Sequence, residues 1–101
     1  MPAGGKAVEW SARATNEYLA TLGYILQHWG NEAAERFEDS IFHQIDRIAR
    51  NPAQFPLINQ TRAIRRCVGT PQNSIFFREQ EKHIQLLSVF DTRQSPDKLK
   101  L

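Results

Sequence analysis

The chain has 101 residues, of which 41% are hydrophobic and 24% charged, and its formal net charge is +2. This length suits a single hydrophobic core, so we expect one domain over residues 1–101. No run of the sequence reaches the roughly 20 apolar residues that span a bilayer. The only cysteine is Cys67, so no internal disulfide is possible, and we expect a cytoplasmic protein with no membrane partner.

The two halves of the chain differ in charge. Residues 1–54 contain five lysine or arginine residues against seven acidic ones, whereas residues 55–101 contain eight against four. A basic half in a small domain often binds an anion, such as nucleic acid or an acidic protein segment. The same imbalance also fits an ordinary solvated surface, and the sequence leaves both interpretations open.

Helical periodicity dominates the first half of the chain, after a short candidate strand at residues 8–10. Ser11 is a favoured N-cap residue, and apolar side chains then recur every three or four positions up to Trp29. Gly30 suits the end of this helix, because glycine readily adopts the left-handed conformation of a C′ residue. The stripe comprises Ala14, Tyr18, Leu22, Ile25 and Trp29, with Leu19 and Leu26 at its sides.

A second helix is predicted from Asn31, which can act as its cap, to the Asn51-Pro52 pair that ends it. Its apolar positions are again three or four residues apart. Two long helices joined by so tight a turn must pack antiparallel, as a hairpin. The stripe of this second helix comprises Ala34, Phe37, Ile41, Ile45 and Ile48.

Strand chemistry follows a connector at residues 52–57, whose two prolines disfavour a helix or a central strand. We predict strands over residues 63–68, 74–78 and 83–90, joined into an antiparallel meander with the third strand central. The predicted fold class is α+β: a short N-terminal strand and an antiparallel helical hairpin packed on a small antiparallel sheet, in the order β-α-α-β-β-β. Loose tails are expected at residues 1–6 and 97–101.

Several short segments stand in a characteristic order along the chain. They are Val8-Glu9-Trp10-Ser11 followed by Ala14, Asn51-Pro52 with Phe55 and Pro56, Ile64-Arg65-Arg66, Ser74-Ile75-Phe76-Phe77-Arg78, Ile84 through Phe90, and Asp91-Thr92-Arg93-Gln94-Ser95-Pro96. In order and spacing they resemble the RelE/ParE toxin superfamily, and the likeness spans about residues 8 to 99. The resemblance implies the toxin of a bacterial type II toxin–antitoxin pair, a plasmid stabilisation system that inhibits growth and is neutralised by a cognate antitoxin.

Two branches of this superfamily act differently. Members of the RelE branch are endoribonucleases that cut messenger RNA on the ribosome, with clustered Lys and Arg and a C-terminal Tyr or His. Here Ser74 stands where that branch often has a basic residue, and no Tyr or His follows Phe90. Asp91 could serve as the base instead, but a carboxylate beside phosphate weakens binding.

These departures favour the ParE-like branch, whose characterised members bind and poison DNA gyrase, over an enzyme. A RelE-like ribosome-dependent mRNA endoribonuclease is the alternative, and an inactive member that only binds its antitoxin is a third. We expect no cofactor, and in particular no small-molecule cofactor. The targets to be distinguished are therefore DNA gyrase and the ribosome with its mRNA.

Arginines of the predicted sheet are the candidate contact residues. Arg65 and Arg66 are adjacent on a strand and point to opposite faces, and alternation alone does not say which one faces the partner. Arg78 and Arg93 lie at strand ends, where arginines can converge. These four are the catalytic candidates if the chain is a nuclease. Together with Phe76 they form the predicted target- or antitoxin-binding set, unless they simply keep the sheet soluble.

Other conspicuous side chains have simpler interpretations. His28, His43 and His83 lie on different elements and form no metal-binding motif. Phe76 and Phe77 face opposite sides of a strand, so one of them belongs to the core and the other to the exposed face of the sheet. The aromatic residues of the helical stripes are expected to be core: Tyr18, Trp29 and Phe37.

Overall fold

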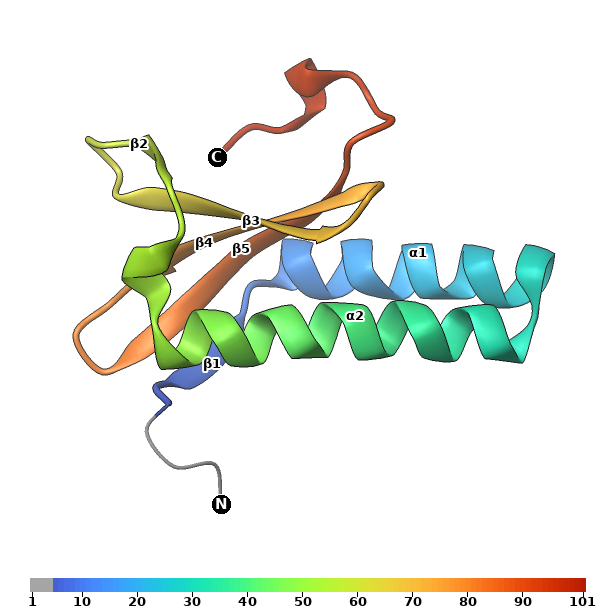
Figure 1. Cartoon of the computed structure of the whole chain (residues 1–101). Helices are drawn as coiled ribbons and strands as arrows, with labels where there is room; N and C mark the ends of the chain where they lie inside the picture. Colours follow the sequence, from blue (N-terminus) through green and yellow to red (C-terminus); the bar gives the residue numbers. More distant parts are fainter. Residues whose placement is uncertain (1–4) are drawn as a thin grey trace.

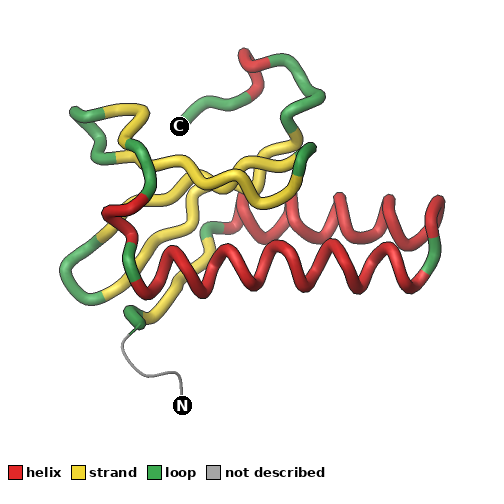
Figure 2. Tube along the Cα trace, in the orientation of Figure 1, coloured by secondary structure: helices red, strands yellow, loops and turns green. Residues whose placement is uncertain are grey.

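The computed structural model describes residues 5–101, so the first four residues of the expected N-terminal tail lie outside it. Two helices form one layer and a sheet forms the other, and the C-terminal segment returns over the side of the sheet opposite the helices (Figure 1 and Figure 2). No helix within these residues has the length and apolarity needed to span a membrane. The elements are β1 (Ala7–Trp10), α1 (Ala12–Trp29), α2 (Asn31–Arg50), the 3-10 helix η1 (Pro52–Gln54), β2 (Leu57–Asn59), β3 (Ile64–Thr70), β4 (Asn73–Glu79), β5 (His83–Asp91) and the 3-10 helix η2 (Pro96–Lys98).

The strands form one five-stranded sheet in the order β1-β5-β4-β3-β2. The β3–β4–β5 meander is antiparallel, as predicted, and β5 lies in the interior between β1 and β4. The sheet as a whole is mixed, because β1 pairs in parallel with β5 from Ala7 opposite His83 to Trp10 opposite Leu86. The strand β2 was not predicted. It lies at the outer edge, where its short length and the preceding Pro56 are tolerated.

Local chemistry sets the boundaries of the hairpin. The Ser11 hydroxyl accepts the Ala14 N–H at 3.0 Å, which confirms the predicted N-cap. Gly30 has a φ of 91°, and its N–H donates to the Leu26 carbonyl at 3.2 Å. Asn31 is the first residue of α2 and not its cap, because Gly30 occupies that position. One glycine therefore ends the first helix and begins the second.

The main core lies between the hairpin and one face of the sheet. The helix α2 approaches the sheet closely at Gly69, where an added Cβ would stand 2.9 Å from Ile41 Cδ1. Glycine therefore lets α2 lie directly on β3 at this point. The buried members of this core are Ala14, Tyr18, Phe37, Ile41, Ile45, Ile48, Phe55, Cys67, Ile75, Phe77, Ile84, Leu86 and Val89.

The hairpin is longer than the sheet it covers, and its far end extends past the β3–β4 turn (Figure 1). Trp29 at this end is 70% exposed, so its predicted place in the core is wrong. Leu19 and Leu26 are exposed as well, because the sheet and α2 cover a narrower stripe of α1 than the apolar pattern suggested. The periodicity located the helix, but the extent of the sheet decides which of its turns are covered.

Candidate functional site

The face of the sheet that points away from the helices carries its own apolar cluster. Ile64, Phe76 and Phe90 are buried there, on β3, β4 and β5. We call this side the outer sheet face. Of the two adjacent phenylalanines, Phe77 packs in the helix-side core and Phe76 lies on the outer face, so one phenylalanine lies on each side, as alternation predicts. Phe76 is nevertheless only 5% exposed, because other residues cover it.

The cover is the C-terminal segment. Leu99 and Leu101, which follow η2, pack against the outer cluster. The prediction of a loose tail at residues 97–101 is therefore wrong for this segment. Its alternating leucines meet an apolar surface on the sheet, and their burial there removes both surfaces from water.

Two arginines hold this segment in place through its main chain. Arg13, in the first turn of α1, donates from Nη2 to the Lys98 carbonyl at 2.8 Å and from Nη1 to the Lys100 carbonyl at 2.9 Å. Arg62, in the turn before β3, donates to the main-chain oxygen of Leu101 at 2.6 Å. Neither arginine was singled out from the sequence, because their carbonyl partners are 39 or more residues away along the chain.

Two of the predicted arginines lie on the outer sheet face. Arg66 is exposed there, and its Nε donates to the Ser74 hydroxyl at 3.1 Å. Arg78 follows on the neighbouring strand and donates from Nη2 to the Gln85 side-chain oxygen at 3.1 Å. This placement shows which arginine of the adjacent pair shares a face with Phe76, because Arg66 and Phe76 are cross-strand partners.

The other two predicted arginines lie elsewhere. Arg65 is on the helix side of β3, and its Nη1 donates to the Phe55 carbonyl at 2.5 Å, which fastens the connector to the sheet. Arg93 forms a bidentate ion pair with Asp91, with Nε–Oδ1 3.0 Å and Nη2–Oδ2 2.8 Å. The four arginines therefore do not converge on one point.

Two titratable residues, His83 and Asp91, lie at the opposite ends of β5. The hydrogen bond from Arg93 holds the pKa of Asp91 below its ordinary value, so this carboxylate is a weak proton acceptor. His83 lies at the β1 end of the sheet, with its Nε2 3.4 Å from a Glu9 carboxylate oxygen. Among residues 5–101 no three His, Cys, Asp or Glu side chains gather as a possible metal site.

Glu17 is a further residue that the sequence did not single out. Its Oε1 accepts the Ser88 hydroxyl at 2.6 Å and the Val89 N–H at 3.0 Å, and its Oε2 pairs with Arg13 Nε at 3.2 Å. The spacing of four residues between Arg13 and Glu17 was a visible signal for the ion pair. Nothing in the sequence indicated that the same carboxylate would reach β5.

The two-layer arrangement has a counterpart among solved structures. The chain is similar to one described as "Chromosomal ParDE TA system from P. aeruginosa", with a TM-score of 0.72 and 19% sequence identity. The match covers 85% of this chain and 95% of that chain, and at this identity it establishes a shared fold. A search of curated proteins returned no match.

The family follows from the sequence model that fits the chain. Residues 8–96 match the model for the ParE toxin of the type II toxin–antitoxin system parDE. The chain therefore belongs to the ParE toxin family of type II toxin–antitoxin systems. This confirms the resemblance first seen in the order of short motifs, and with it the ParE-like branch of the superfamily.

Proposed function

We propose that this chain is a growth-inhibiting toxin that acts by binding DNA gyrase and is neutralised by a cognate antitoxin. The proposal assigns the contact with the target to the outer sheet face. The observation that supports it most is the set of partners of Arg66 and Arg78. Both guanidinium groups bond to neutral oxygens, from Ser74, Gln85 and a main-chain carbonyl, so none of these hydrogen bonds pairs an arginine with an ionisable side chain that could act as acid or base in RNA cleavage.

A basic surface suits the recognition of an acidic protein segment. Arginine can contact a carboxylate of the partner through two parallel hydrogen bonds. Lys98 and Lys100 are exposed on the covering segment and add to the positive charge of this face. The same chemistry suits an acidic segment of an antitoxin, so one surface serves for both inhibition and neutralisation.

A supercoiling assay with purified gyrase tests the proposal. The wild-type chain should inhibit supercoiling, and Arg66→Gln should weaken that inhibition by about tenfold or more, since a charge-assisted hydrogen bond contributes roughly 1.5–3 kcal/mol. Arg50→Gln is the matched control, because Arg50 is also exposed but lies at the end of α2 and pairs with Asp46. Equal inhibition by the two variants would contradict the assignment of the gyrase contact to the outer sheet face.

The competing activities predict different outcomes after induction in cells without antitoxin. A ribosome-dependent nuclease would produce mRNA ends at defined codon positions while supercoiling stays intact. Harmless expression of the wild-type chain would indicate a member that only binds its antitoxin.

A further inference from the structure

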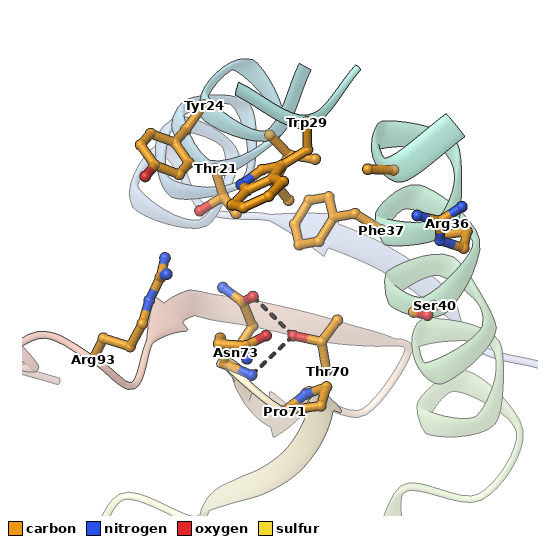
Figure 3. Close-up of a pocket in the computed structure, with 13 residues that line it drawn as sticks. Thr21, Tyr24, Trp29, Arg36, Phe37, Ser40, Thr70, Pro71, Asn73 and Arg93 are labelled. Carbon is orange, nitrogen blue, oxygen red and sulfur yellow. Dashed lines mark hydrogen bonds between the residues drawn. The ribbon is translucent and has the colours of Figure 1, made fainter. Parts of the chain in front are cut away.

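A second surface lies at the far end of the helical hairpin, apart from the outer sheet face. A cleft of about 460 Å³ opens there between α1, α2 and the turn that joins β3 to β4. Figure 3 shows Trp29 and Phe37 on the helical side, facing Asn73 across the gap, with Arg36 and Arg93 on opposite sides. We propose that this cleft binds an acidic peptide segment that inserts a bulky apolar side chain between the aromatic rings and the turn.

The helical side of the cleft exposes aromatic rings that an apolar group can pack against. Trp29 is the most exposed of the large hydrophobic residues in the described part of the chain, and Tyr24 is about half exposed. Phe37 is buried and closes the back of the cleft. Because water around such rings is released when an apolar group packs on them, these residues favour a partner with a large aliphatic or aromatic side chain.

The opposite side of the cleft presents an unused hydrogen-bond donor. Asn73 is 3% exposed, and its Oδ1 accepts the Thr70 hydroxyl at 2.9 Å. The Thr70 hydroxyl oxygen also accepts the Gln72 N–H at 3.2 Å, so the hydroxyl proton is the one donated to Asn73. This fixes the orientation of the Asn73 side-chain amide, with its oxygen toward Thr70. The Asn73 Nδ2 is buried and has no partner within residues 5–101. In Figure 3 it points into the cleft, where a main-chain carbonyl of a bound peptide would satisfy it.

The two arginines supply the preference for acidic residues. Arg36 lines the cleft and makes no hydrogen bond or ion pair with any described residue. Arg93 uses Nε and Nη2 for Asp91, so its Nη1 remains available to a ligand. Since the guanidinium groups stand on opposite sides of the cleft, the favoured segment has carboxylates on both sides of its apolar anchor (Figure 3).

The surroundings of the cleft favour a peptide over a nucleic acid. Between Asn31 and Ser40, α2 carries four acidic residues and only one arginine, Arg36. An adjoining hollow is lined by Glu17 and Asp91. A phosphate backbone repeats its charge at every nucleotide, and a strand that continued from the cleft into this hollow would meet the carboxylates of Glu17 and Asp91. A peptide can instead place single carboxylates at the two arginines. The site thus adds a second contact surface to the chain, independent of the proposed contact with gyrase.

The test begins with a displayed library of random peptides, selected on the intact chain. Enriched peptides should carry Asp or Glu on both sides of a large apolar residue. Binding of a synthetic copy of the best peptide is then measured by fluorescence in a Trp10→Phe background, which leaves Trp29 as the single tryptophan. We expect its emission to move to shorter wavelength on binding, because the exposed indole becomes covered.

Matched variants assign the binding to the cleft. Arg36→Gln should weaken the binding of the synthetic peptide by about tenfold or more. Arg50→Gln, on the same helix, should leave the binding unchanged. Both residues are exposed, so both variants should fold. The proposal is overturned if no peptide is enriched, if enriched peptides lack acidic residues, or if the two variants bind equally. It is also overturned if oligothymidylate competes with the peptide, because the cleft would then be a nucleic-acid site.

Discussion

The carboxylate of Glu17 accepts the main-chain N–H of Val89 at 3.0 Å. A side chain of α1 thus supplies the hydrogen bond that a neighbouring strand would otherwise give to this part of β5. The pairing of β1 with β5 ends at Leu86, and α1 begins where that pairing stops. The other oxygen of Glu17 pairs with Arg13, which holds the C-terminal segment on the outer sheet face. One ion pair therefore links the first helix, the last strand and the covering segment.

Replacing Glu17 should lower the stability of the whole domain. Glu17→Ala leaves the Ser88 hydroxyl and the Val89 N–H without their acceptor, and a buried donor left unpaired costs about 1–3 kcal/mol. Urea unfolding should show this loss as a lower midpoint with an unchanged slope. Glu35→Ala is the control, because Glu35 is exposed and surface substitutions usually change stability by less than about 0.5 kcal/mol.

The C-terminal leucines should be needed to cover the outer sheet face. Replacing Leu99 and Leu101 together with serine weakens the packing on Phe76 and Phe90, at a cost of about 1–3 kcal/mol for two half-buried leucines. We expect a lower unfolding midpoint and increased binding of a dye that reports exposed apolar surface. Lys98→Ser combined with Lys100→Ser should change neither measurement, and a dye signal as large as that of the leucine variant would contradict the assigned cover.

Two glycines should respond to alanine with opposite signs. A Cβ at Gly23 meets no atom within 4 Å, so Gly23→Ala in the exposed middle of α1 should stabilise the chain by about 0.5–1 kcal/mol. A Cβ at Gly69 would meet Ile41 and Ile75 at 2.9 and 3.2 Å, so Gly69→Ala should destabilise it by about 1–3 kcal/mol. Thermal unfolding of the two variants checks both signs, and a stabilised Gly69→Ala variant would mean that the side chains of Ile41 and Ile75 make room for the added methyl group.

The pair of Asp91 and Arg93 should make stability depend on acidity. Because the pKa of Asp91 is lower in the folded chain than its ordinary value of 3.8, its contribution is fully present above that value. The contribution is lost as the pH falls through the lowered pKa of the folded state. The difference in unfolding free energy between wild type and Asp91→Asn, about 1 kcal/mol or less for so exposed a pair, should therefore be constant from pH 7 to about 5 and shrink below about 4. A difference that stays constant down to pH 3 would show that the ion pair does not form in solution.

Cys67 should react slowly with thiol reagents in the folded chain. Burial raises the pKa of its thiol to about 11 from the ordinary value of 9.0, so at pH 8 the reactive thiolate is about a hundredfold scarcer than in an unfolded chain. Reaction with a disulfide reagent should be at least that much slower without urea than in urea. A rapid phase in the native chain would indicate that β3 opens readily from α2.

Most of the fold follows from local patterns in the sequence. The periodicity from Ala14 to Ile48, the cap at Ser11 and the joint at Gly30 predict the hairpin, because helix ends and apolar stripes depend on residues close together in the chain. The meander is predicted for the same reason, since its turns are short. The edge strand β2 was missed, because its pairing with β3 depends on how the connector is held by Arg65.

The candidate sites depend on contacts between distant parts of the chain. The family resemblance and the basic second half were visible in the sequence, since motif order and charge need no coordinates. The sequence did not show which arginines share a face, or that Glu17 reaches Val89. It also did not show that Leu99 and Leu101 cover Phe76, or that Trp29 is exposed. Each of these is decided by where the helices cross the sheet and where the sheet ends, and that geometry exists only after the chain has folded.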